Sequence, residues 1–130
     1  MDYIITTEQL TKKYKNFISV NNVSLHIRKG SIYGFLGPNG AGKSTLVNLL
    51  ARFYDATDGQ IRIGGHDIRS YSREELRGKI GMVMQKAQLF SGTIRSNLLW
   101  GNPGATDEML WAALETAQAA EFVQKKEKQL

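Results

Sequence analysis

The sequence predicts an α/β fold, and three observations support that prediction. Residues 32–36 are a short apolar run suited to a buried strand. Residues 37–45 read Gly-Pro-Asn-Gly-Ala-Gly-Lys-Ser-Thr, and residues 46–53 carry apolar side chains at helical spacing. A glycine-rich loop therefore lies between a strand and a helix. Residues that favour strands lie on both sides of this unit, so we expect an antiparallel β region around it.

The loop matches the phosphate-binding pattern G-x-x-x-x-G-K-S/T without a departure. In this arrangement the backbone N–H groups and the positive end of the helix dipole converge on the phosphates. Lys43 is the expected catalytic cation for the outer phosphates, and the Ser44 hydroxyl is a candidate ligand for Mg²⁺. The residues expected to bind the nucleotide here are Gly37, Asn39, Gly40, Ala41, Gly42, Lys43, Ser44 and Thr45.

The remaining strands are predicted from β-branched residues, alternation and turn signals. Residues 4–14 and 23–27 are expected to form an antiparallel pair. A tight reversal at Gly64-Gly65 is expected to join strands at 60–63 and 66–68. The apolar residues 79–84 predict a buried strand that ends at Gln85, where a polar side chain is well placed for ligand chemistry.

Helix starts are predicted from capping residues. Ser72 and Glu75 have the spacing of a capping box, which predicts a short helix to about Arg77. Thr106 is expected to cap a helix that has two acidic residues in its first turn. Further helices are expected over residues 93–100 and 119–128.

Composition limits the class of protein. The chain has 130 residues, 42% of them hydrophobic, which is enough for one domain with a core, and it has no cysteine. The net charge is +5, but the basic residues are scattered, so we expect no nucleic-acid partner. No apolar run approaches the roughly 18 residues of a membrane span, and Asp2 and Glu8 do not suit a signal peptide. We therefore expect a soluble, cytoplasmic chain.

Beyond these patterns, the chain resembles the nucleotide-binding domain of ATP-binding cassette (ABC) transporters. Tyr14 follows Leu-Thr-Lys-Lys, where this family places an aromatic residue that stacks on adenine. Gln85 matches the family's Q-loop glutamine, a catalytic residue that approaches Mg²⁺ and the attacking water. Without the resemblance, Tyr14 equally fits a surface strand residue and Gln85 a polar strand end.

The resemblance implies a P-loop NTPase core of the RecA-like kind with an antiparallel β subdomain, incomplete at the C-terminus. Residues 1–130 would be a partial nucleotide-binding domain, in which the helical subdomain starts at about residue 93. It implies ATP and Mg²⁺ as ligands. The implied partners are a membrane domain, contacted through the region after Gln85, and a second nucleotide-binding domain. The location would be the inner face of the membrane.

The two parts of the chain resemble different branches of the family. Residues 1–45 look like the separate ATP-binding subunits of peptide-antibiotic efflux systems. The rest looks like exporters whose ATPase is fused to membrane helices, as in Arg-Phe-Tyr-Asp at 52–55. A hybrid origin is therefore one hypothesis for this sequence.

The chain also departs from the family pattern. It contains no Leu-Ser-Gly-Gly signature and no apolar run that ends in Asp-Glu, and His26 and His66 fit surface strands or turns better than a catalytic switch. Because hydrolysis depends on such carboxylates, we expect weak or no ATP turnover by this chain alone. The alternatives are a non-catalytic nucleotide-binding remnant or hybrid fragment, and a small P-loop kinase or other NTPase.

Overall fold

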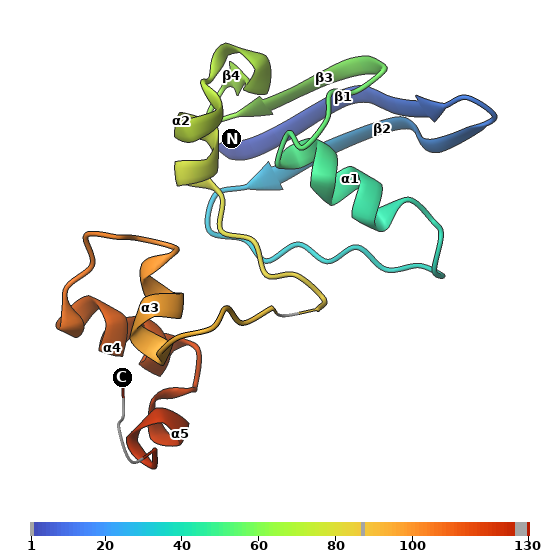
Figure 1. Ribbon diagram of the computed structural model, residues 1–130. Coiled ribbons are helices and arrows are strands. Elements are labelled where there is room, and N and C mark those ends of the chain that lie inside the picture. The colour runs from blue at the N-terminus through green and yellow to red at the C-terminus, as the bar shows by residue number, and fades with distance from the viewer. Residues whose placement is uncertain (1, 87, 127–129) are drawn as a thin grey trace. The chain divides into compact units, whose positions relative to one another are not determined.

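The structure is a computed structural model that describes residues 2–86, 88–126 and 130 (Figure 1). The chain forms two compact units, Met1–Met82 and Val83–Leu130. The first unit contains β1 (Tyr3–Tyr14), β2 (Phe17–Arg28), α1 (Lys43–Leu50), β3 (Asp58–Ile63), β4 (His66–Asp67), the 3-10 turn η1 (Ile68–Ser70) and α2 (Arg73–Lys79). The second contains α3 (Ile94–Leu99), α4 (Asp107–Thr116) and α5 (Ala120–Gln124).

The described strands form one antiparallel sheet with the order β2-β1-β3-β4. The predicted pairing of the first two strands is confirmed, since Thr7 of β1 lies opposite Leu25 of β2. The predicted reversal at Gly64-Gly65 is also confirmed, because Ile63 pairs with His66 across it. Strand β1 is therefore central, with β2 on one side and β3 on the other.

A buried threonine stabilises the irregular part of the β1–β2 pair. The register shifts between Thr7 and Leu10, and Thr7 is completely buried there. Its hydroxyl donates to the Val23 carbonyl at 2.9 Å and accepts from the Leu25 N–H at 3.0 Å. The polar groups at the bulge are thus satisfied inside the hairpin, as buried groups must be.

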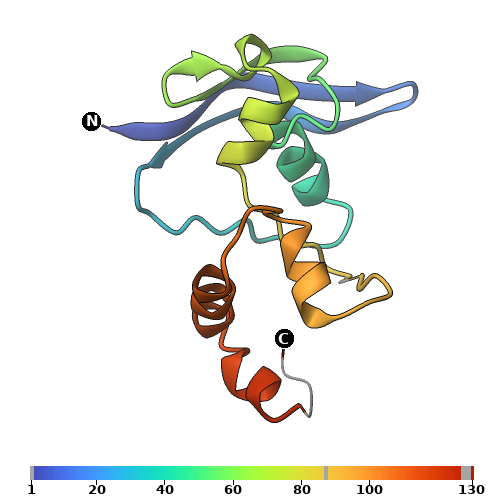
Figure 2. The same ribbon diagram turned by 60° about the vertical axis from the view of Figure 1, so that its left-hand side comes forward.

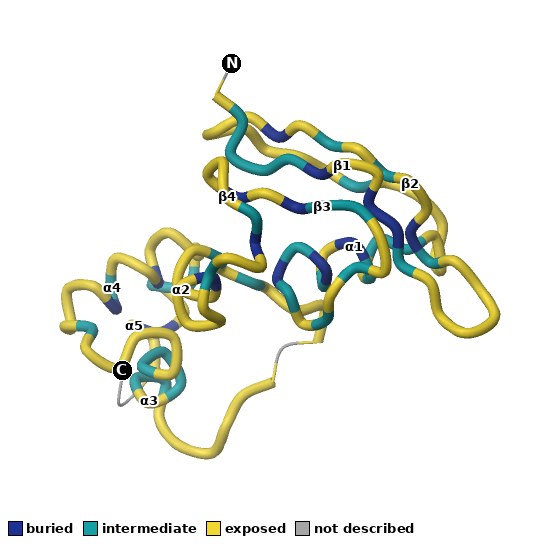
Figure 3. The backbone as a smooth tube through the Cα atoms, turned by 90° about the horizontal axis from the view of Figure 1, so that it is seen from above, coloured by how far each residue is buried: buried dark blue, intermediate teal, exposed yellow. Residues whose placement is uncertain are grey.

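Helix α1 packs along one face of this sheet (Figure 2). Leu46 and Leu49 of α1 are buried among residues of the strands. Figure 3 shows buried stretches in dark blue on α1 and on the strands. The residues of this core cluster are Leu10, Val20, Leu46, Leu49, Ile61, Ile63, Ile68 and Leu76. The helix that follows the glycine-rich loop is thereby fixed to the hairpin.

Two predicted strands are absent from the described structure, and both predictions were wrong. Residues 32–36 form no strand, and Leu36 is 98% exposed. Residues 79–84 begin in the last residue of α2 and continue without a strand, with Val83 99% exposed. An apolar run becomes a strand only where a neighbour completes its hydrogen bonds. No described strand pairs with either segment.

The predicted caps are confirmed by their hydrogen bonds. The Ser72 hydroxyl accepts from the Glu75 N–H at 3.2 Å, and the Ser72 N–H donates to the Glu75 carboxylate at 2.8 Å. Thr106 likewise accepts from the Met109 N–H at 3.4 Å at the start of α4. These short-range sequence signals therefore set where α2 and α4 begin.

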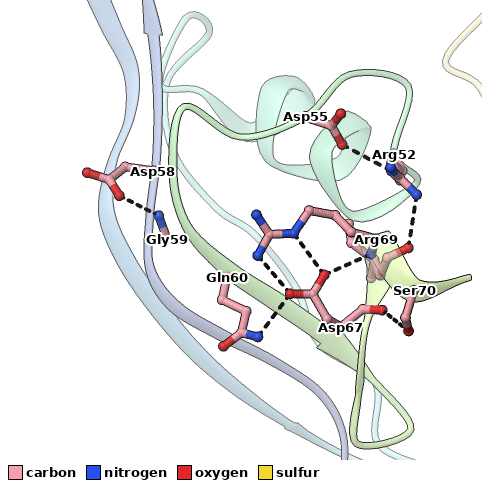
Figure 4. Close-up of polar contacts among 9 residues, drawn as sticks. Arg52, Asp55, Asp58, Gly59, Gln60, Asp67, Arg69 and Ser70 are labelled. Atoms are coloured by element: carbon pink, nitrogen blue, oxygen red, sulfur yellow. Dashed lines mark hydrogen bonds and ion pairs between the residues drawn. The ribbon is translucent and has the colours of Figure 1, made fainter.

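A network of charged side chains joins the end of α1 to the β4 region (Figure 4). The Asp67 carboxylate accepts from the Arg69 guanidinium at 2.8 and 3.0 Å, from the Arg69 N–H at 2.8 Å and from Gln60 at 2.9 Å. The Arg69 guanidinium and backbone N–H hold the pKa of the Asp67 carboxyl well below its usual range, against the opposing effect of burial. Arg52 pairs with Asp55 at 3.0 Å and donates to the Ile68 carbonyl at 3.3 Å.

The second unit is helical in its described part. Leu110 and Leu114 of α4 and Val123 of α5 are buried. The helix predicted over residues 93–100 corresponds to α3, and the one predicted over 119–128 corresponds in part to α5; residues 127–129 lie outside the described residues. Across the described residues, no helix has the length and apolar character to cross a membrane.

Candidate nucleotide-binding site

The glycine-rich loop approaches β2 so closely that one position accepts only glycine. Gly42 immediately precedes α1 and has a φ of 81°. A Cβ atom placed on Gly42 would lie 2.1 Å from the carbonyl oxygen of Ser19 in β2. Both the backbone angle and this contact exclude a side chain. The loop therefore passes directly over the hairpin before the helix begins.

The start of α1 has the features of a phosphate site. Gly42 is the N-cap and offers no side-chain acceptor, and the first turn contains no acidic residue. The partial positive charge of this helix end is thus left for a ligand. Lys43 folds back over the loop, where its ammonium donates to the Gly37 carbonyl. The cation predicted to bind the outer phosphates lies against the loop itself.

The two hydroxyl residues after Lys43 have different surroundings. Ser44 is exposed in the first turn of α1. The Thr45 hydroxyl shares a hydrogen bond with the Ser19 hydroxyl at 2.7 Å. Ser19 thus contacts the loop twice, through its carbonyl beside Gly42 and through its side chain. The loop motif did not indicate that Ser19 of β2 would contact the loop.

Tyr14 lies at the end of β1 in the same unit as the loop. The turn after Tyr14 and the start of α1 lie at the same end of the sheet (Figures 1 and 2). Tyr14 is 38% exposed, and a hydrogen bond to Tyr54 raises the pKa of Tyr14. Of the predicted site residues, the structure therefore brings Tyr14 to the end of the sheet where residues 37–45 lie.

Gln85 belongs to the other unit. It is exposed and lies in a stretch without helix or strand, so the prediction of a strand ending at Gln85 is wrong. Its predicted roles toward Mg²⁺ and water stay predictions. His26 and His66 lie in β2 and β4 and are exposed, which agrees with the surface context expected for both.

A cavity of about 520 Å³ lies beside the loop. Apolar side chains such as Val20, Phe35 and Leu46 line much of it, together with Gly42 and Lys43. A triphosphate needs N–H groups and cations around it, whereas this lining is mostly that of a protein core. The cavity lies beside residues 33–36, which belong to the segment 32–36 that was expected to form a buried strand.

A glycine loop fixed between a hairpin and a helix amino end defines a P-loop nucleotide-binding domain. Comparisons with known proteins identify the family. A family model described as ABC transporter matches residues 20–130. The chain therefore belongs to the ABC transporter family, and the alternative of a small P-loop kinase is set aside.

Two curated relatives show how much of a longer protein the chain matches. It is 46% identical over 104 residues to an uncharacterized ABC transporter ATP-binding protein, YwjA, of Bacillus subtilis (strain 168). The same values apply to a putative multidrug export ATP-binding/permease protein of Staphylococcus aureus (strain NCTC 8325 / PS 47). In each case the match covers 80% of this chain and 18% of the relative. The chain thus matches less than a fifth of the length of these relatives.

A solved structure confirms the fold prediction. The chain superposes on a bacterial Atm1-family ABC exporter with ATP bound, with a TM-score of 0.89 and 34% identity. The superposition covers 96% of this chain and 22% of the exporter chain. The predicted P-loop NTPase core with an antiparallel β subdomain is therefore confirmed, although two of its strands do not form here.

Proposed function

We propose that the chain binds ATP with Mg²⁺ as the nucleotide-binding part of an ABC exporter. The observation that carries the proposal is the close approach of the loop to β2 at Gly42. A Cβ atom on Gly42 would collide with the Ser19 carbonyl oxygen. Such close passage holds the loop's amides at the start of α1, where a phosphate is favoured. The ATP-bound exporter on which the chain superposes, and the relatives named for export, support the same assignment.

The residues have distinct proposed roles. Residues 37–45 would hold the phosphates through their backbone N–H groups, and Lys43 would place its charge on the outer phosphates. Ser44 and Gln85 would hold Mg²⁺, which neutralises phosphate charge when it is bound. Tyr14 would stack on adenine. These side chains bind and orient the nucleotide.

The proposed function also implies partners and a location for the chain. We propose that residues 1–130 are part of a nucleotide-binding domain, with a helical subdomain starting at about residue 93. The region after Gln85 would contact a membrane domain at the inner face of the membrane, and a second nucleotide-binding domain would complete the site. Rapid hydrolysis would then be a property of the assembly, because this sequence holds no apolar run that ends in Asp-Glu.

Calorimetric titration with MgATP tests the proposal. Lys43→Ala should weaken binding by at least about tenfold, equivalent to about 1.4 kcal/mol, because a charge-assisted contact to phosphate is lost. Lys29→Ala is the matched control, since Lys29 is an exposed lysine in the turn after β2. If the unmodified chain binds no MgATP, or if both variants bind like it, the proposal is wrong.

A further inference from the structure

Two aromatic rings stack at the end of the β1–β2 hairpin. Tyr14 and Phe17 are directly paired across the turn, so their side chains lie on the same face of the hairpin. Their ring centroids are 5.2 Å apart, with 24° between the ring planes. Tyr14 is 38% exposed and Phe17 is 61% exposed. The pair thus presents aromatic surface to solvent, and Phe17 presents more of it.

Tyr14 is the fixed ring of this pair. The Lys12 ammonium lies 5.6 Å from the Tyr14 ring centroid and 5.1 Å from that of Tyr54, and donates to the Asp55 carbonyl at 2.7 Å. The Tyr54 hydroxyl accepts from Asn48 of α1 at 3.2 Å. Lys12 and Tyr54 therefore connect the Tyr14 ring to the residues at and beyond the end of α1.

The strand that carries Phe17 also contacts the phosphate loop. Two residues beyond Phe17, the Ser19 hydroxyl shares a hydrogen bond with Thr45 at 2.7 Å, and the Ser19 carbonyl blocks any side chain at Gly42. The spacing between the ring pair and residues 42–45 is consequently set by a few backbone bonds and one hydrogen bond. Phe17 is thus separated along β2 by one residue, Ile18, from the position that contacts the loop.

We propose that Phe17 is a base-positioning residue, which forms with Tyr14 a two-ring platform for the base of the bound nucleotide. The inference rests on the proposed nucleotide binding and adds a residue that the sequence pattern did not indicate. A planar base gains from stacking on an aromatic face, and Phe17, which stacks against Tyr14, offers more free ring surface than Tyr14 does. The fixed Tyr14 ring limits the orientations open to Phe17, so less freedom is lost on binding.

Comparing a ligand with a base to one without it tests this role. Calorimetry would measure the Kd of MgATP and of magnesium tripolyphosphate for the 130-residue chain and for three variants. Phe17→Ala should weaken MgATP binding about five- to tenfold and leave tripolyphosphate binding unchanged, because stacking acts only on the base. Phe17→Tyr should restore MgATP binding. Ile18→Ala, a change at the next exposed apolar residue of β2, should alter neither Kd.

Other outcomes would overturn the inference. A pair that only stabilises the hairpin would make Phe17→Ala lower the unfolding midpoint while both ligands bind as before. Equal weakening of MgATP and tripolyphosphate would show a disturbed loop, not a lost base contact. Failure of Phe17→Tyr to restore MgATP binding would contradict stacking. If the unmodified chain binds tripolyphosphate and MgATP equally well, the platform is wrong but the phosphate site stands; if it binds neither, both proposals fail.

Discussion

At the scale of single residues, Gly42 decides whether the loop can take its shape. Its φ of 81° is costly for any residue with a Cβ atom, and the Ser19 carbonyl fills the place where that atom would be. The loop requires glycine at this position for both reasons. The sequence pattern predicts the glycine, but only the folded hairpin shows what the glycine must avoid.

Gly42→Ala should therefore destabilise the first unit and weaken nucleotide binding together. We expect a loss of at least about 1 to 2 kcal/mol in the free energy of unfolding, from the strained angle alone. Urea unfolding measures this loss. Gly78→Ala is the control: Gly78 lies in α2 with open space around it, so alanine there should be neutral or stabilise by up to about 1 kcal/mol. Equal effects from the two substitutions would contradict the argument.

Asp67 gives the stability of the first unit a defined pH dependence. Because the Arg69 guanidinium lowers the pKa of the Asp67 carboxyl in the folded state, its contribution is present above the unfolded pKa of about 3.9. That contribution is lost as the pH falls further toward the folded pKa. Asp67→Asn should cost about 1 kcal/mol at pH 7, and progressively less as the pH is lowered to about 2. Urea unfolding at both pH values measures the difference in free energy of unfolding between the unmodified chain and the variant. A difference that does not decrease on acidification would contradict this explanation.

At the scale of elements, the start of α2 depends on Ser72. The capping box supplies two hydrogen bonds there, and Leu76 on α2 belongs to the core of the first unit. Ser72→Ala should lower the free energy of unfolding by about 1 kcal/mol. Ser72→Asp keeps an oxygen acceptor and should retain most of the stability. Chemical denaturation measures both, and an unchanged midpoint for Ser72→Ala would be evidence against the cap.

Elements that depend on neighbouring residues were predicted best from the sequence. Helix caps, the Gly64-Gly65 reversal and the hairpin pairing rest on contacts between residues close in the chain or joined by one turn. The strands expected at 32–36 and 79–84 failed because a buried strand requires partners, and no described strand pairs with them. In the candidate site, the motif predicts residues 37–45, and their role stays a prediction. The contacts of Ser19 with the loop, and of Phe17 and Lys12 with Tyr14, could not be predicted, because they depend on the folded hairpin.

At the scale of the whole molecule, the unpaired apolar segments have a consequence for behaviour in solution. Ile32, Leu36 and Val83 are almost completely exposed. Exposed apolar chain with free backbone groups favours association between molecules. Sedimentation velocity should show self-association that grows with concentration, and the double variant Ile32→Lys, Val83→Lys should reduce it. A monomer at all concentrations would contradict this prediction.

The central claim is that residues 37–45 bind ATP. The most direct measurement is a titration of ¹⁵N-labelled chain with MgATP, followed by backbone amide NMR. We expect the largest shifts on the amides of residues 39–45, and we expect Lys43→Ala to remove them at the same nucleotide concentration, because these N–H groups are proposed to bind the phosphates. Amide shifts that are absent from this loop, or that persist in full with Lys43→Ala, would contradict the account.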